Sequence, residues 1–236
     1  MTERRKVVLV TGPEGNLGSA VVQRFKKDDP SLILIDRHPD RLVERYPELQ
    51  SSETNLLLPG VDLLDRKAVQ NAVQQGISQF ERVDCLIHTV GGFTMGETVA
   101  KLSDRTLHKM FDLNLISLLN IAQAVIPQMV EAQSGKIVTV GARPSFSGKA
   151  RMSAYSIAKS AVLRLTESMS AELKGIGINV NCLIPGTIDT PENRQAMPDA
   201  DTSGWVTPAS LAEVIYFLCS PGADDIHGSA VPVYGA

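Results

Sequence analysis

The sequence predicts an α/β protein: a single domain in which a doubly wound parallel sheet is covered by helices on both faces, giving three layers. The first observation behind this prediction is that short, β-branched apolar segments alternate with helical segments along the chain, the order that βαβ crossovers produce. The second is that no repeat, low-complexity tract or linker interrupts the alternation over 236 residues, which indicates one domain.

The expected strands are short apolar runs, most of them closed by a polar or glycine-containing turn. Pro59 and Gly60 make the third irregular, and Asn179 and Asn181 interrupt the sixth. In chain order, the expected strands are 6–10, 31–35, 55–61, 83–89, 136–141, 176–184 and 228–233.

The expected helices lie between these strands. Asp65 is a possible N-cap for an amphipathic helix, and the longest helix carries one polar amide, Asn114, among apolar neighbours. In chain order, the expected helices are one running from the first glycine-rich turn to about residue 27, a short one after Asp36, and 65–79, 102–132, 153–174 and 207–219.

Residues 185–206 break the alternation. They are rich in Pro, Asp, Thr and Asn, and long for a loop in a compact domain. Because they follow the carboxyl end of a strand, they would overhang the crevice where open α/β sheets bind ligands. We expect a substrate lid here, and a mobile surface insertion is the alternative.

The turn after the first strand, Thr-Gly-Pro-Glu-Gly-Asn-Leu-Gly, has the context of a phosphate-binding loop. Glycines allow the backbone to approach a pyrophosphate, and the helix that follows offers free N–H groups and the positive end of its dipole. A purely structural strand-to-helix turn is the alternative. The residues expected to contact a dinucleotide are Gly12, Gly15, Asn16, Leu17 and Gly18.

An acidic residue, Asp36, stands about 20 positions beyond this loop at the end of the second strand, where a carboxylate accepts hydrogen bonds from an adenosine ribose. A carboxylate there repels a 2′-phosphate, so Asp36 favours NAD over NADP. Arg37 opposes this prediction, because a guanidinium could accept that phosphate. Asp36 could also act as the N-cap of the helix that follows.

Composition restricts the function classes. The chain is 43% hydrophobic and 21% charged, with a formal net charge of −3, which argues against a nucleic-acid or anionic-membrane surface. No apolar run approaches the roughly 20 residues of a membrane span. The three cysteines are scattered in apolar runs and the four histidines lack metal-ligand spacing. We therefore expect a soluble, cytoplasmic protein without a metal, a nucleic-acid partner or a membrane segment.

Tyr155 and Lys159 are four residues apart on the helix expected at 153–174, so their side chains share one face. A phenol is a poor proton donor or acceptor near neutrality, because its reference pKa is about 10. A neighbouring ammonium would favour the phenolate and lower that pKa toward the range of acid/base catalysis. Taken alone, the pair could equally be an accident of an exposed helix.

Together these features resemble the short-chain dehydrogenase/reductase family, over essentially the whole chain. The matching residues are Gly12, Gly15, Gly18, Asp36, Asp62, Gly91, Asn114, Tyr155, Lys159 and the segment 185–190.

The resemblance implies a Rossmann-like fold, an NAD(H)-dependent oxidoreductase acting on a small organic substrate, and a homodimer or homotetramer built through the helices at 102–132 and 153–174. It implies that Tyr155 is the general acid/base, that Lys159 lowers its pKa and binds the nicotinamide ribose, and that Asn114 supports a proton-relay water. It also implies contacts to the adenine from Asp62 and to the rest of the cofactor from Gly91, Pro185, Gly186, Ile188 and Thr190.

Two departures from the family pattern matter. His88-Thr89-Val90-Gly91 stands where the family has Asn-Asn-Ala-Gly, and we expect His88 to be structural. Ala142 stands where the family has its substrate-orienting serine, and the spacing selects neither Ser145 nor Ser147 as a replacement. Loss of that hydroxyl removes a donor for a developing oxyanion.

Ala142 leaves two alternatives to ordinary carbonyl or alcohol chemistry. The segment from Asp189 to Asp201, followed by Trp205, resembles the quinonoid dihydropteridine reductases, which also lack the serine and reduce a conjugated imine with NADH. The other alternative is a catalytically weak NAD-binding sensor or scaffold.

Overall fold

A computed structural model describes residues 4–50 and 52–235, and every structural statement below concerns those residues. It contains one seven-stranded sheet, parallel throughout, in the order β3-β2-β1-β4-β5-β6-β7. The predicted fold class is confirmed. The strands are β1 Val7–Thr11, β2 Ser31–Asp36, β3 Asn55–Pro59, β4 Cys85–His88, β5 Gly135–Val140, β6 Ile178–Pro185 and β7 Ala230–Val233.

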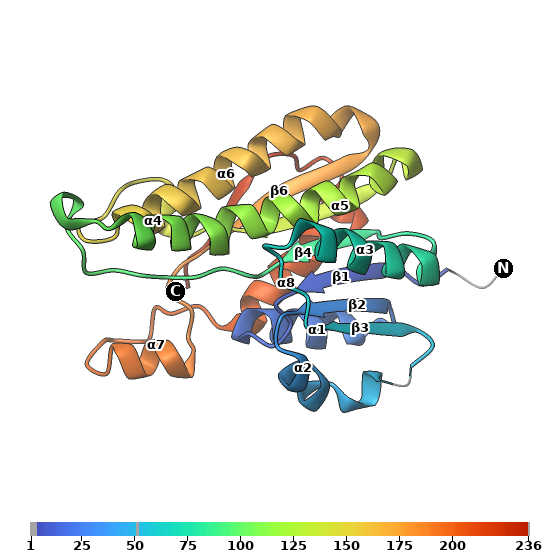
Figure 1. Ribbon diagram of the computed structural model, residues 1–236, viewed down its shortest axis with the longest axis horizontal. Coiled ribbons are helices and arrows are strands. Elements are labelled where there is room, and N and C mark those ends of the chain that lie inside the picture. The colour runs from blue at the N-terminus through green and yellow to red at the C-terminus, as the bar shows by residue number, and fades with distance from the viewer. Residues whose placement is uncertain (1–3, 51, 236) are drawn as a thin grey trace.

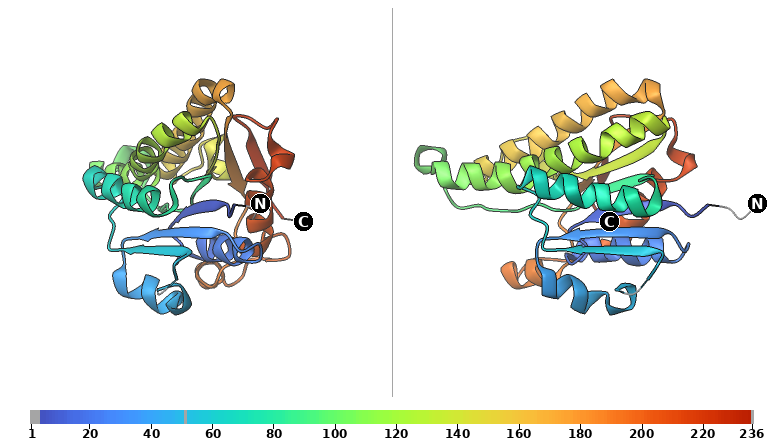
Figure 2. Two further views of the ribbon diagram at one scale, coloured as in Figure 1. Left: turned by 90° about the vertical axis from the view of Figure 1, so that its right-hand side faces the viewer. Right: turned by 45° about the vertical axis from the view of Figure 1, so that its right-hand side comes forward.

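Helices cover both faces of the sheet (Figures 1 and 2). One layer contains α1 Asn16–Lys26, α2 Pro39–Arg45 and α8 Pro208–Leu218. The other contains α3 Arg66–Phe80, α4 Asp104–Phe111, α5 Ser117–Ala132 and α6 Ser153–Leu173.

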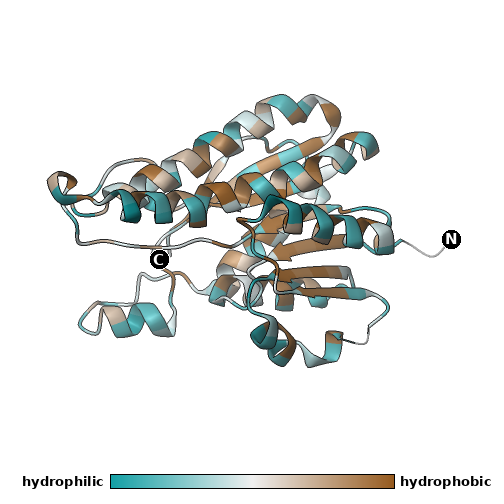
Figure 3. Ribbon diagram, in the orientation of Figure 1, coloured by the Kyte–Doolittle hydropathy of each residue, from teal (hydrophilic) through white to brown (hydrophobic). Residues whose placement is uncertain are grey.

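The alternation of side chains along β1 separates two cores. Val8 and Val10 pack with α1 and α8 on one face, whereas Val7 and Leu9 pack with α3 and α5 on the other. In Figure 3 the strands β1 and β2 are accordingly mostly brown, and teal is frequent on the outward faces of the helices. Strands buried on both faces read as continuous apolar runs, which is why the sequence revealed them.

The helix predicted over 102–132 is continuous from residue 104 but contains a π-helical turn, Asp112–Ile116, between α4 and α5. The backbone N–H of Ser117 reaches the carbonyl of Asp112, so one extra residue is inserted in the helix. π-bulges of this kind frequently lie at functional sites. Asn114 is in the middle of this one and is buried.

By length and apolar composition, the continuous helix 104–132 would be long enough to cross a membrane, so the expectation that no run approaches that length is wrong for this helix. The apolar side chains of this helix form part of the protein core. Ile121, Val125 and Met129 are fully buried against the sheet. Core helices of soluble proteins pass the same test, and one such helix is weak support for a membrane segment.

The segment 185–206 is not wholly a loop. It contains α7 Pro191–Ala196, whose N-cap Thr190 accepts a hydrogen bond from the Asn193 N–H and whose first residue is a proline. A β-bridge between Ile188 and Val206 closes the base of the segment. In Figure 1, α7 projects from the body of the molecule beneath the carboxyl edge of the sheet.

Two capping predictions have different outcomes. Asp65 is the N-cap of α3, because its carboxylate accepts from the N–H groups of Lys67 and Ala68. Asp36 is not the N-cap of α2. It is the last residue of β2 and accepts from the N–H of His38, which is the N-cap.

Candidate functional site

The carboxyl ends of β1, β2 and β4 border a cavity of about 500 Å³. The strand order reverses between β1 and β4, and open α/β sheets bind ligands at such a switch point. Seven of the residues predicted to bind cofactor line this cavity, hereafter the cleft: Gly12, Gly15, Asn16, Asp36, Arg37, Asp62 and Gly91.

The glycine loop is built as a tight turn between β1 and α1. Gly12 has a φ of +71°, a conformation that favours glycine, and its N–H donates to the Ile35 carbonyl. A Cβ on Gly18 would overlap the Gly12 carbonyl oxygen. Gly15 is the N-cap of α1 and supplies no side-chain acceptor, so the first N–H groups of the helix are left for a ligand.

Two other residues of the loop differ in orientation. Leu17 packs its side chain in the core and does not line the cleft, which leaves only its backbone for a cofactor. Asn16 is exposed, and its amide donates to Glu192 of α7 at 2.8 Å. The segment 185–206 therefore touches the glycine loop, although Pro185, Gly186, Ile188 and Thr190 do not themselves line the cleft.

At the β2 end of the cleft, Asp36 lies beside two groups that the sequence analysis did not identify. His38 Nδ1 lies 3.3 Å from Asp36 Oδ1 and 3.8 Å from Glu14 Oε2. Burial and the negative charge of Asp36 raise the pKa of Glu14. Arg37 and Arg41 also line this end of the cleft, with both side chains exposed.

Two predicted catalytic side chains converge on Gly91, at the turn after β4. A Cβ on Gly91 would lie 2.8 Å from Asn114 Oδ1 and 3.2 Å from Lys159 Nζ. The Asn114 amide donates to the carbonyls of Gly92 and Met110 and accepts from the Gly92 N–H, so the π-helical turn fixes the loop after β4. The ammonium of Lys159, a buried residue, donates to the Val140 carbonyl at 2.8 Å.

Tyr155 lies on the same helix but in a more apolar environment. Its ring packs edge-on against Phe93 with centroids 5.0 Å apart, and burial raises its pKa to about 12. Burial also lowers the pKa of Lys159 to about 8. The expectation that the ammonium depresses the tyrosine pKa is therefore wrong for the protein without cofactor. Desolvation of the phenolate prevails, and the ammonium is engaged by Val140.

Neither candidate for the missing serine hydroxyl is placed as a substitute. Ser145 is buried, and its Oγ accepts from the Ala142 N–H at 3.1 Å. That Oγ and Cys182 Sγ both lie close to where a Cβ on Gly141 would be, which places the hydroxyl next to β6. Ser147 is exposed on the loop before α6.

His88 cross-links the elements around the cleft. Its Nδ1 lies 2.9 Å from Thr11 Oγ1 and its Nε2 lies 3.3 Å from Ser117 Oγ, which joins β4 to β1 and α5. Burial, together with the charge of Lys159, lowers the pKa of His88 to about 3. The imidazole therefore stays neutral at physiological pH, which supports the structural role expected for it.

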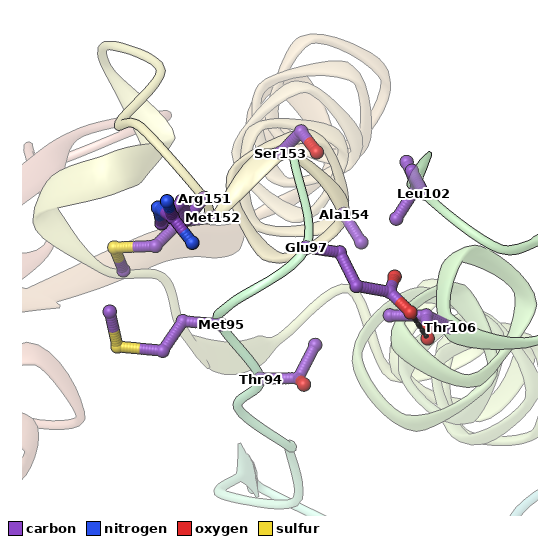
Figure 4. Close-up of a pocket in the computed structure, with 9 residues that line it drawn as sticks. All are labelled: Thr94, Met95, Glu97, Leu102, Thr106, Arg151, Met152, Ser153 and Ala154. Atoms are coloured by element: carbon purple, nitrogen blue, oxygen red, sulfur yellow. Dashed lines mark hydrogen bonds between the residues drawn. The ribbon is translucent and has the colours of Figure 1, made fainter. Parts of the chain in front are cut away.

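A second, much smaller cavity of about 10 Å³ lies where the loop after β4 meets the start of α6 (Figure 4). The Glu97 carboxylate accepts from the hydroxyls of Ser103 and Thr106. The guanidinium of Arg151 donates to the Gly96 carbonyl. The cavity has room for about one water molecule, so it cannot hold an organic substrate.

The family model for short chain dehydrogenase matches residues 6–201. This chain belongs to that family. It is 25% identical to the 3-oxoacyl-[acyl-carrier-protein] reductase FabG of Thermotoga maritima, over 98% of this chain and 96% of the relative. It is 29% identical to the cyclohexanol dehydrogenase of Rhodococcus sp., with the same coverage of both chains. The resemblance inferred from the motifs is thus confirmed, and the chain is a member of an oxidoreductase family.

Solved structures agree with this fold. The crystal structure of gox2181 superposes with a TM-score of 0.89 at 27% identity, covering 98% of this short-chain dehydrogenase and 95% of gox2181. ElxO with NADP bound superposes with a TM-score of 0.88 at 23% identity, covering 97% of each chain. NAD⁺-bound xylitol dehydrogenase gives 0.89 at 21% identity, covering all of both chains. Two of these solved structures contain a nicotinamide cofactor, NADP in ElxO and NAD⁺ in xylitol dehydrogenase.

Proposed function

We propose that this short-chain dehydrogenase is an NAD(H)-dependent enzyme that transfers hydride between the nicotinamide and a small organic substrate, a carbonyl, an alcohol or a conjugated imine. The observation that carries the proposal is the layout of the cleft. The glycine loop and Asp36 line one end, and at Gly91 the cleft meets Asn114 and Lys159.

The residues fit a dinucleotide. The uncapped N-terminus of α1 would hold the pyrophosphate, because its N–H groups have no side-chain acceptor and Gly12 and Gly18 bring the backbone close. Asp36 would accept hydrogen bonds from the adenosine ribose, and Asp62 would contact the adenine. Lys159 would hold the nicotinamide ribose, and the segment 185–190 would border the ring.

The bound nicotinamide would supply or accept the hydride, and the protein would handle the proton. With a pKa of about 12, the Tyr155 phenol is protonated at neutral pH, so it is ready to donate to a substrate atom that gains a hydride. Asn114 holds the loop that carries Gly91, and both its Oδ1 and the Lys159 ammonium lie close to Gly91, where Asn114 would support a relay water. Phe93, whose ring packs against Tyr155, would give the substrate an apolar contact beside the phenol.

Tyr155→Phe tests this mechanism. The variant keeps the ring against Phe93 and loses only the hydroxyl, so NADH binding should remain nearly unchanged. Turnover should fall by a factor of about 10² to 10⁴, the usual contribution of a general acid or base. The measurements are fluorescence titration with NADH and the steady-state rate on the best substrate. Turnover equal to the wild type would eliminate Tyr155 as the acid/base.

Ala142 favours a second candidate within the same chemistry, the reduction of a conjugated imine of the quinonoid dihydropterin type. Ala142 has no hydroxyl, and the nearest buried serine, Ser145, is bonded to the Ala142 backbone. Such a substrate has no developing oxyanion to stabilise. A panel of ketones, quinones and a quinonoid dihydropterin with NADH separates the candidates. Binding of NADH without turnover of any of them would indicate a sensor or scaffold.

Three further properties belong to the same proposal. We propose that NADH is preferred over NADPH because Asp36 faces the ribose site. We propose a homodimer or homotetramer formed through the exposed faces of the helices at 104–132 and α6. We also propose a cytoplasmic location, consistent with three buried cysteines that are free thiols. Binding titrations, light scattering and cell fractionation test them in turn.

A further inference from the structure

Glu14 places a second carboxylate next to Asp36 at the ribose end of the cleft. The ligand atoms of Glu14, Asp36 and His38 all lie within 4.8 Å of one another. The Glu14 side chain is only 12% exposed and that of Asp36 only 9% exposed. Both residues line the cleft. They are therefore a partly desolvated pair facing a ligand cavity, unlike the solvated charge pairs of a protein surface.

One oxygen of this pair has no donor. Glu14 Oε1 is buried and has no hydrogen-bond partner among the residues that the structure describes. A buried carboxylate oxygen without a donor is costly. Burial raises the pKa of Glu14, and so do the negative charge of Asp36 and a side-chain hydrogen bond with it, whereas the charges of His38 and Arg41 lower it. Glu14 Oε1 is closed to solvent, so a ligand in the cleft would bring its hydroxyl donors to the other carboxylate oxygen, Oε2, which is not among the buried atoms without a partner.

The backbone holds Glu14 in this position. The Tyr46 hydroxyl, fully buried, donates to the Pro13 carbonyl at 2.7 Å, and the Gly12 N–H donates to the Ile35 carbonyl at 3.0 Å. The two residues just before Glu14 are thereby tied to Tyr46, which follows α2, and to Ile35 of β2. The carboxylate is thus presented to the cleft by a fixed backbone, as Asp36 is.

We propose that Glu14 is a second specificity-determining residue for the cofactor, and that it binds the adenosine ribose together with Asp36. A ribose with two adjacent hydroxyls brings two donors, one for each carboxylate. A 2′-phosphate removes one donor and brings negative charge against both carboxylates. The inference rests on the proposed function, because it takes NAD(H) as the ligand of the cleft.

Three guanidinium groups at the same end, Arg37, Arg41 and Arg45, could attract a 2′-phosphate instead. All three residues are exposed, and their charge is screened by water and salt. Glu14 and Asp36 are partly desolvated, and like charges repel more strongly there than on an exposed surface. The carboxylates therefore set the preference.

The test compares the dissociation constants of NADH and NADPH in the wild type, Glu14→Gln, Glu14→Asp and Glu44→Gln. Glu14→Gln keeps the side-chain shape and removes the charge, so the preference for NADH should fall by about tenfold or more, with tighter NADPH binding. Glu14→Asp restores the charge and should restore most of the preference. Glu44 is exposed on α2 and does not line the cleft, so Glu44→Gln controls for net charge and should leave the ratio unchanged.

Several results would overturn the inference. An unchanged ratio of the NADH and NADPH dissociation constants in Glu14→Gln would do so. An equal loss of affinity for both cofactors would also do so, because it indicates a role in loop structure alone. Calcium binding to the nucleotide-free wild type that Glu14→Gln abolishes would assign the cluster to a cation. The proposed function fails separately: a wild type that binds neither dinucleotide overturns both proposals, whereas NADH binding with an unaltered ratio in the variant removes only the role of Glu14.

Discussion

Replacing Gly18 or Gly15 by alanine separates the packing of the glycine loop from its contact with a ligand. The same methyl group is added at both positions, within one loop. On Gly18 it would overlap the Gly12 carbonyl oxygen and lie 2.8 Å from the carbonyl carbon, and both atoms are backbone. On Gly15 it would meet the same oxygen at 3.5 Å, an ordinary contact, at a φ of −66° that any residue can adopt.

Overpacking of a well-packed interior costs about 1–3 kcal/mol. The cost of Gly18→Ala should be near the upper end of this range, because the added methyl group meets the Gly12 carbonyl, a backbone group that cannot rotate away as a side chain could. For a chain of this size, a loss of about 2–3 kcal/mol lowers the melting temperature by about 4–12 °C. Gly15→Ala should melt close to the wild type, since replacing an N-cap glycine by alanine costs about 1 kcal/mol or less.

The assay pairs thermal unfolding with NADH titration. Gly18→Ala should lose both stability and NADH affinity, because the loop must move to admit the methyl group. Gly15→Ala should keep its stability and lose affinity, because Gly15 lines the cleft where the pyrophosphate is expected. Equal melting temperatures for the two variants would refute the packing argument. Equal affinities for Gly15→Ala and the wild type would move the pyrophosphate away from the N-terminus of α1.

Two more predictions follow from His88 and Thr190. His88 has a pKa of about 3 in the folded protein and about 6.5 in the unfolded chain, so below pH 6.5 the unfolded chain binds a proton that the folded protein does not. The free energy of unfolding should therefore decrease as the pH falls below 6.5, by about 1.4 kcal/mol per pH unit. Urea unfolding between pH 7 and pH 4 should show a shallower loss in His88→Asn than in His108→Asn, an exposed control, and parallel slopes would contradict the argument. Thr190→Ala removes the cap of α7 at a cost of about 1 kcal/mol and should speed amide exchange in α7, whereas Thr190→Ser should not; identical exchange in the two variants would show that the cap contributes nothing.

The central strands and their parallel arrangement could be predicted because β1, β2, β4, β5 and β6 are apolar runs separated by helices, so the sequence pattern and the burial coincide. The π-helical turn at Asn114 could not. One inserted residue changes the backbone but leaves an apolar helical pattern on both sides. The role of the turn, which is to place Asn114 against Gly92 and Met110, is visible only in the hydrogen bonds of the structure. The polar amide in an apolar segment marked the position without indicating the turn.

The helix α7 was missed although its signals are present. Thr190 followed by Pro191 and Glu192 is an N-cap, a proline at the first helical position and an acidic first turn. The segment was predicted as a loop because its composition is rich in Pro, Asp and Asn, and these three helix-start signals were not weighed against that composition. Glu14 was missed for a different reason. Its proximity to Asp36 depends on how the loop folds back toward the end of β2, a tertiary relation that spacing along the chain does not contain.

The error about Tyr155 and Lys159 has the same origin. Residues four apart on a helix share a face, but this fixes neither where a long side chain ends nor how dry its surroundings are. The Lys159 ammonium extends to the Val140 carbonyl, and the phenol lies against Phe93. Sequence spacing thus located the pair correctly on one helix but did not indicate that, without cofactor, burial raises the tyrosine pKa.

The sign of that shift bears on the direction of the proposed reaction. A substrate that is reduced needs a proton donor, and a phenol with a pKa of about 12 is one at neutral pH. A substrate that is oxidised needs a base, so the pKa would have to fall by several units, each of which requires about 1.4 kcal/mol of added stabilisation of the phenolate. Lys159 does not supply this while it donates to Val140. The phenol of the protein alone is thus protonated at neutral pH, and its proposed use as a base in an oxidation requires a bound cofactor or a rearranged Lys159 to lower its pKa.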